Sequence, residues 1–78
     1  MLLKIAWTKT MLEKFIDEAL LTKDEERVLR TRIAGWSVVK QSTEMGLSTA
    51  TISRIITNIT KKYISVQSLY PDIFPPLK

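Results

Sequence analysis

The arrangement of this chain depends most on residues 37–62, which read SVVKQSTEMGLSTATISRIITNITKK. Ser37 and Ser48 are typical helix N-caps, and Gly46 is typical of a residue that ends a helix. The stretch therefore predicts a short helix that ends at Gly46, a turn, and a second helix over residues 49–62. β-Branched residues lower the helix propensity of the second segment, so tertiary packing must hold it helical.

The helix expected over residues 49–62 has two opposite faces. At about 100° per residue, its apolar side chains fall on one side and its small polar and cationic side chains on the other. The apolar side holds Ile52, Ile55, Ile56, Ile59 and Tyr63. The polar side holds Ala50, Ser53, Arg54, Thr57 and Lys61. A strand is the local alternative, but adjacent Ile55 and Ile56 break the alternation that a strand requires.

Two further helices are expected before this stretch, where they would serve as a scaffold. One apolar helical stripe comprises Leu12, Phe15, Ile16, Ala19 and Leu20. Thr22 followed by Glu25 is a capping-box pattern, which predicts a helix over residues 23–34. The side chains expected in the core from this helix and the next are Val28, Leu29, Ile33, Val38, Val39 and Met45.

Composition excludes most enzyme chemistry. The 78 residues include neither Cys nor His, so thiolate nucleophiles, histidine acid–base catalysis and the common zinc ligands are absent. We expect one domain, no enzymatic activity, no cofactor and no small-molecule ligand. No apolar run approaches the roughly 20 residues of a membrane span, and no cleavage site follows the opening MLLKIAW. The sequence therefore predicts a cytoplasmic protein without a membrane partner.

The two ends of the chain each leave two alternatives open. Prolines at 71, 75 and 76 predict a short tail over residues 65–78 beyond a domain of residues 1–64. No turn signal divides this tail into the hairpin of a wing. The tail either closes the core of its own chain or packs on a second subunit. The N-terminal helix and Trp7 likewise either cover the core of their own chain or form an interface with a second subunit. A thin core favours a homodimer through the N-terminal helix, the tail or both.

The polar side of the helix over residues 49–62 suits the major groove of DNA. Short hydroxyl side chains can bond several base edges, and the Ala50 methyl can touch a thymine methyl. Arg54 can bind guanine or a phosphate, and Lys61, further along the helix, is expected to contact the DNA backbone. Residues 36–78 hold five basic and two acidic side chains, which favours a polyanion. An ordinary solvated face is the alternative.

Residues 21–63 resemble the LuxR-type (GerE-like) DNA-binding domain, which is itself similar to region four of bacterial sigma factors. The matching positions, which run without a gap, are Leu21-Thr22, Glu25, Val28-Leu29, Gly35, Ser37, Ser48, Thr51-Ile52, Asn58-Ile59 and Lys62. Gln41 and Ser42 stand where that family usually has an aliphatic residue and Ala. Residues 48–54, STATISR, also resemble the Trp-repressor-like family, with a deletion before the motif.

Both resemblances imply a small transcription regulator that binds double-stranded DNA sequence-specifically and is associated with the nucleoid. The expected fold is an all-α bundle of four to five helices with a helix-turn-helix at residues 37–62, a recognition helix at 49–62 and no wing. The implied DNA contacts are Lys40, Ser48, Thr49, Ala50, Thr51, Ser53, Arg54, Thr57, Asn58, Lys61 and Lys62. Thr51 and Asn58 flank the polar side, where backbone contacts are favoured. The alternative is a protein-interaction adaptor or antirepressor that retains the same frame, as the low net charge of +4 suggests.

Overall fold

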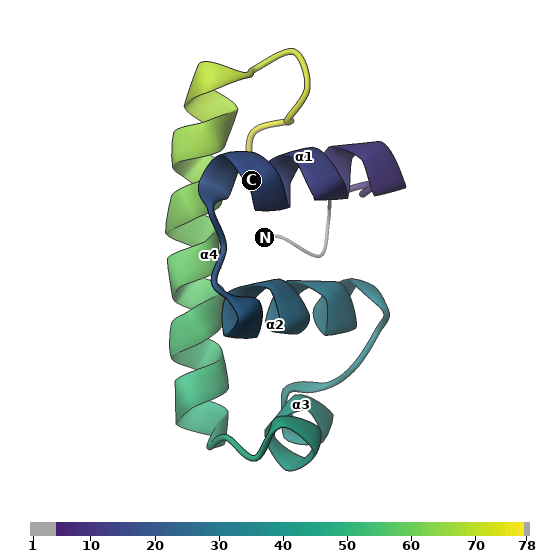
Figure 1. Cartoon of the computed structure of the whole chain (residues 1–78), viewed down its shortest axis with the longest axis vertical. Helices are drawn as coiled ribbons and strands as arrows, with labels where there is room; N and C mark the ends of the chain where they lie inside the picture. The colour runs from purple at the N-terminus through teal and green to yellow at the C-terminus, as the bar shows by residue number, and fades with distance from the viewer. Residues whose placement is uncertain (1–4, 78) are drawn as a thin grey trace.

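A computed structural model describes residues 5–77, so residues 1–4 of the N-terminal segment and Lys78 of the tail lie outside the described part. The described chain forms four α-helices and no strand, which confirms the all-α prediction. The helices are α1 (Lys9–Ala19), α2 (Lys23–Ile33), α3 (Val38–Met45) and α4 (Thr49–Leu69). Figure 1 shows α4 as one long upright helix, with α1, α2 and α3 stacked along its side.

Each helix begins at a residue with a hydroxyl group. Thr8, Thr22, Ser37 and Ser48 each accept a hydrogen bond from a first-turn backbone amide, which would otherwise lack a partner. At the other end of α3, Gly46 has a φ of 67°, a left-handed conformation that glycine adopts without steric cost. The predicted caps of α2, α3 and α4 and the predicted glycine stop are therefore confirmed.

An aromatic cluster forms the centre of the core where α1, α4 and the tail meet. Phe15, Tyr63 and Phe74 are each 0% exposed, and their ring centroids lie between 5.5 and 6.1 Å apart. Trp7 packs 5.6 Å from the Phe15 ring, and the Tyr63 hydroxyl donates a hydrogen bond of 2.5 Å to the Pro75 carbonyl. The N-terminal segment and the tail therefore close the core of their own chain.

The last predicted helix is longer than expected, and its predicted end at Lys62 is wrong. α4 continues to Leu69, because Tyr63 and Val66 lie one turn apart and both pack into the core. Pro71 disfavours a helical conformation at Tyr70, so the helix ends there. Residues 65–69, which were expected in the tail, are the final turn of α4.

Two apolar side chains expected inside the molecule are exposed instead. Leu20 is 81% exposed because it is the left-handed cap residue of α1, which turns it off the apolar stripe. Val39 is 68% exposed because the inner face of α3 follows Val38, Gln41 and Met45. These two predictions are wrong.

Gln41 is a fully buried polar residue that joins α3 to α2. Its Nε2 group donates hydrogen bonds of 2.9 Å to the Val28 carbonyl and 2.8 Å to the Thr31 hydroxyl. Its Oε1 atom has no hydrogen-bond partner within the described chain. These directional bonds fix how α3 sits on α2, and because α3 leads directly into α4, they also help to orient α4.

A partly buried ion pair joins the start of α2 to the middle of α4. Glu25 is 7% exposed, and its Oε1 atom lies 2.6 Å from the Lys62 ammonium and 3.0 Å from the Thr22 amide. Burial raises the pKa of the Glu25 carboxyl, but the hydrogen bonds from Lys62 and Thr22 and the Lys62 charge outweigh it, so the net pKa lies below the ordinary value. The pair therefore stabilises the fold while Glu25 is ionised.

Acid is expected to remove the stabilisation that Glu25 provides. Its pKa is lower in the folded chain, so the stabilisation is present above the unfolded value of about 4.3 and is lost as the pH falls through the folded value. We expect Glu25→Gln to lower the free energy of unfolding by about 1.5–3 kcal/mol at pH 7. Urea unfolding of both proteins between pH 7 and pH 3 should show this difference shrinking in acid.

Glu44→Gln is the matched control, because Glu44 is exposed and no cation lies within 4 Å of it in residues 5–77. Its unfolding free energy should stay within about 0.5 kcal/mol of the wild-type value. A Glu25→Gln difference that remained constant across the pH range would contradict the assigned role of the ion pair.

Candidate nucleic-acid interface

The N-terminal half of α4 presents one exposed face of short polar and cationic side chains. Its exposed residues are Ala50, Ser53, Arg54, Thr57, Asn58 and Lys61. On the opposite side, Ile52 is 0% and Ile59 1% exposed, and Ile55 and Ile56 are half-buried against the core. The predicted division of this helix into a core face and a solvent face is confirmed. We call residues 48–61, less the core-facing isoleucines, the α4 polar face.

Hydroxyl groups at the start of α4 are partly engaged in holding the helix. The Ser48 Oγ atom lies 3.1 Å from the Thr51 amide, from which it accepts a hydrogen bond, and 2.9 Å from the Thr51 hydroxyl. Thr51 is half-buried, whereas Ser48 and Thr49 are exposed. Ser48 and Thr51 therefore form the rim of the α4 polar face, and their first role is to cap the helix.

The hydroxyl groups of Ser53 and Thr57, further along α4, differ in the hydrogen bonds that they can still form. The Thr57 hydroxyl donates a hydrogen bond of 3.1 Å to the Ser53 carbonyl, so its oxygen can only accept a further bond. The Ser53 hydroxyl has no hydrogen bond within the described chain and can donate or accept. Thr57 therefore offers an acceptor and Ser53 an adaptable hydroxyl group, one turn apart on this face.

The turn between α3 and α4 is tied by its own hydrogen bonds. The Ser42 carbonyl accepts bonds from the Gly46 and Leu47 amides, and the Ser42 hydroxyl donates to the Leu47 carbonyl. Leu47 and Met45 pack against the core beside these bonds. A small hydroxyl residue at position 42 therefore fixes the turn, and with it the angle at which α4 leaves α3.

The cations expected at the site divide into two groups. Within residues 5–77, no carboxylate lies within 4 Å of Arg54, Lys61 or Lys40. The Lys62 ammonium is instead held 2.6 Å from Glu25 and is turned towards α2. The structure therefore gathers the predicted residues from Ser48 to Lys61 on one face, places Lys40 on α3, and separates Lys62 from both.

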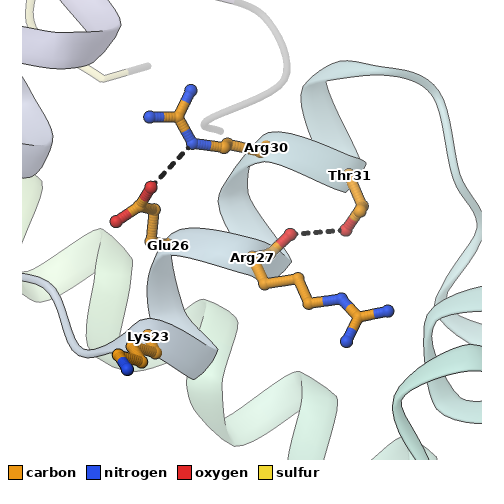
Figure 2. Close-up of a pocket in the computed structure, with 5 residues that line it drawn as sticks. All are labelled: Lys23, Glu26, Arg27, Arg30 and Thr31. Carbon is orange, nitrogen blue, oxygen red and sulfur yellow. Dashed lines mark hydrogen bonds and ion pairs between the residues drawn. The ribbon is translucent and has the colours of Figure 1, made fainter.

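A second concave surface lies along α2 and has a different character. Figure 2 shows its lining residues, Lys23, Glu26, Arg27, Arg30 and Thr31. Arg30 is neutralised there by Glu26 and by Glu13 of α1, each 2.9 Å away. No group of three acidic, Cys or His side chains that could hold a metal occurs in the described chain. This surface has two exposed cations, Lys23 and Arg27. Its lining side chains do not form an arrangement typical of a catalytic or metal site.

Sequence reasoning overlooked the surroundings of Lys40. Its ammonium lies 4.5 Å from the centroid of the Trp36 ring, and the Arg32 side chain bonds the Trp36 carbonyl. The signal that was available is the four-residue spacing of Trp36 and Lys40 across the start of α3. Arg32 and Trp36 have the same four-residue spacing, but α2 ends between them, so helical periodicity does not predict that contact.

No protein-family model matches this chain, and neither a curated protein nor a solved structure matches it. The likeness to LuxR-type domains therefore rests on sequence motifs alone. Among the described helices, none has the length and apolar character needed to cross a membrane.

Proposed function

We propose that this chain binds double-stranded DNA sequence-specifically, as a small transcription regulator whose α4 enters the major groove. The observation that carries the proposal is the α4 polar face, which combines short side chains with cations that have no carboxylate within 4 Å in the described chain. A major groove about 12 Å wide admits an α-helix whose leading side chains are short. The short α3 and the Gly46 turn supply the support that a groove-reading helix needs.

Each side chain on the face has a proposed partner that follows from its chemistry. The Ala50 methyl meets a thymine methyl, and the Arg54 guanidinium binds guanine through two parallel hydrogen bonds. Thr57 accepts from a base amino group, because its own proton is committed to Ser53. Lys61, further along the helix, meets a phosphate. Thr49, Ser48, Thr51 and Asn58 lie at the rim, where backbone contacts prevail.

Binding to a labelled duplex of random sequence tests this proposal. We expect association at about 50 mM salt that weakens at least about 3-fold at about 200 mM, because the phosphate contact of Lys61 alone releases roughly one counterion. Fluorescence anisotropy at both concentrations measures the change. Absence of binding at the lower concentration would rule out the proposed function.

A protein-interaction adaptor is the second candidate, and exposed apolar side chains favour it. Leu69 at the end of α4 is 75% exposed, and Ile64 on the same helix is 55% exposed. An adaptor that uses this part of α4 would form a stable complex with a protein partner and would show no salt-sensitive binding to DNA.

A two-fold assembly on DNA is the proposed arrangement, because palindromic half-sites require paired subunits. Phe74 of the tail is buried in the core of its own chain. The exposed apolar side chains nearby, which are available for a contact between subunits, are Leu69 and Ile73. Sedimentation of the free protein and of its complex with a selected site measures the stoichiometry. One protein per duplex on a palindromic site would contradict the dimer.

A further inference from the structure

Two cations converge on one tryptophan at the junction of α2 and α3. The Arg32 guanidinium donates a hydrogen bond of 3.2 Å to the Trp36 carbonyl. The Lys40 ammonium lies over the Trp36 ring, 4.5 Å from its centroid. Trp36 itself is half-buried and lies between the two helices in the chain. We call Arg32, Trp36 and Lys40 the junction cluster.

Neither cation of the junction cluster is neutralised within the molecule. In residues 5–77, no carboxylate lies within 4 Å of Arg32 or Lys40. Arg30 of the same helix α2 provides the contrast, because Glu13 and Glu26 each lie 2.9 Å from it, and Figure 2 shows the contact with Glu26. The junction cluster therefore keeps two positive charges available to an external anion.

The contacts with Trp36 also limit the motion of both side chains. A free lysine or arginine loses about 2 kcal/mol of rotamer entropy when it is fixed. The cation–π contact of Lys40 and the hydrogen bond of Arg32 remove part of that freedom before any ligand arrives. An anion that binds both cations therefore meets a partly ordered site.

The junction cluster and the turn that leads into α4 lie at opposite ends of α3. Lys40 lies six residues before Gly46, or about 9 Å along the axis of α3. In helix-turn-helix complexes the helix before the reading helix crosses the DNA backbone, so the proposed docking of α4 would bring the start of α3 and its cations towards a flanking phosphate strand.

We propose that Arg32 and Lys40 bind phosphodiester oxygens of the DNA backbone beside the groove, with Trp36 as their positioning residue. This inference rests on the proposed function and adds Arg32 and Trp36 to its contacts. The Arg32 guanidinium suits two oxygens of one phosphate, whereas the Lys40 ammonium acts as a point charge. Backbone contacts carry no sequence information, so the cluster adds affinity equally on all sequences.

Salt titration of Lys40→Gln against Lys23→Gln tests the phosphate contact. Both variants remove one exposed lysine, but Lys23 lies in the α2 surface of Figure 2, away from the junction cluster. We expect Lys40→Gln to reduce the slope of log affinity against log salt by about 0.9, and Lys23→Gln to leave it unchanged. Arg32→Gln should reduce the slope by the same amount as Lys40→Gln.

A double-mutant cycle tests the positioning role of Trp36. Trp36→Leu keeps both cations and should weaken duplex binding about 2–5-fold, the value of a surface cation–π contact. In the Lys40→Gln background, the same change should leave binding nearly unchanged, because the Trp36 ring positions Lys40, whereas leucine keeps the backbone carbonyl that holds Arg32. A purely structural role would give the same loss in both backgrounds, and circular dichroism confirms that each variant is folded.

The outcomes separate this inference from the proposed function. If the wild-type protein binds with a steep salt dependence but Lys40→Gln and Lys23→Gln have equal slopes, the junction cluster is not a phosphate site and the proposed function stands. If the wild-type protein does not bind duplex DNA at low salt, both proposals are overturned.

Discussion

Replacing Phe74 with alanine is expected to lower the free energy of unfolding by about 3–5 kcal/mol. The Phe74 side chain is 0% exposed and packs against the rings of Phe15, Tyr63 and Tyr70. A loss of this size removes a large part of the roughly 4–12 kcal/mol that a domain of this length possesses. Urea unfolding followed by circular dichroism measures it.

Ile73→Ala is the matched control for this prediction. Ile73 precedes Phe74 in the chain but is 44% exposed, so its truncation should cost less than about 1 kcal/mol. Equal effects of the two substitutions would show that the tail does not close the core as described. A Phe74→Ala loss that depended on protein concentration would show that the tail packs on a second copy instead.

Arg54→Ala is expected to weaken binding to a selected DNA site by about 1–3 kcal/mol, or roughly 5- to 150-fold. Arg54 is the only arginine on the α4 polar face, and no carboxylate within 4 Å competes for it in the described chain. If it reads guanine, the loss is confined to sites with the preferred base, and preference at that position disappears. Competition titration with single-base variants of the site measures both effects.

Arg27→Ala is the control, since it removes one exposed arginine from the α2 surface and leaves the α4 polar face intact. It should change affinity only slightly and alter no base preference. An equal loss for Arg54→Ala on every sequence would assign Arg54 to a phosphate. No loss at all would contradict the role of α4 as the reading helix.

Local signals made the start of each helix after α1 and the α3 stop predictable. Thr22 with Glu25, Ser37 and Ser48 act on backbone groups within the same turn, so their spacing in the sequence specifies their geometry. The positive φ of Gly46 is likewise a local requirement. The two faces of α4 could be predicted because helical periodicity places them without knowledge of the remaining fold.

Features that depend on distant partners could not be predicted in the same way. Lys61 and Lys62 are neighbours of one residue type, yet Lys62 bonds Glu25, which lies 37 residues earlier in the chain, and Lys61 remains exposed. Gln41 is buried because its side-chain amide donates hydrogen bonds to a carbonyl and a hydroxyl group of α2. The last part of α4 is helical because Val66 packs into the core. No local sequence pattern predicts that contact.

Titration of duplex DNA into isotopically labelled protein shows, residue by residue, where a nucleic acid lies. At low salt, the amide resonances of residues 48–61 and of the junction cluster should shift, while those of α1 stay in place. These shifts should disappear as salt is raised. Absence of shifts at low salt, or shifts confined to α1 and residues 64–77, would contradict the claim that the N-terminal half of α4 reads DNA.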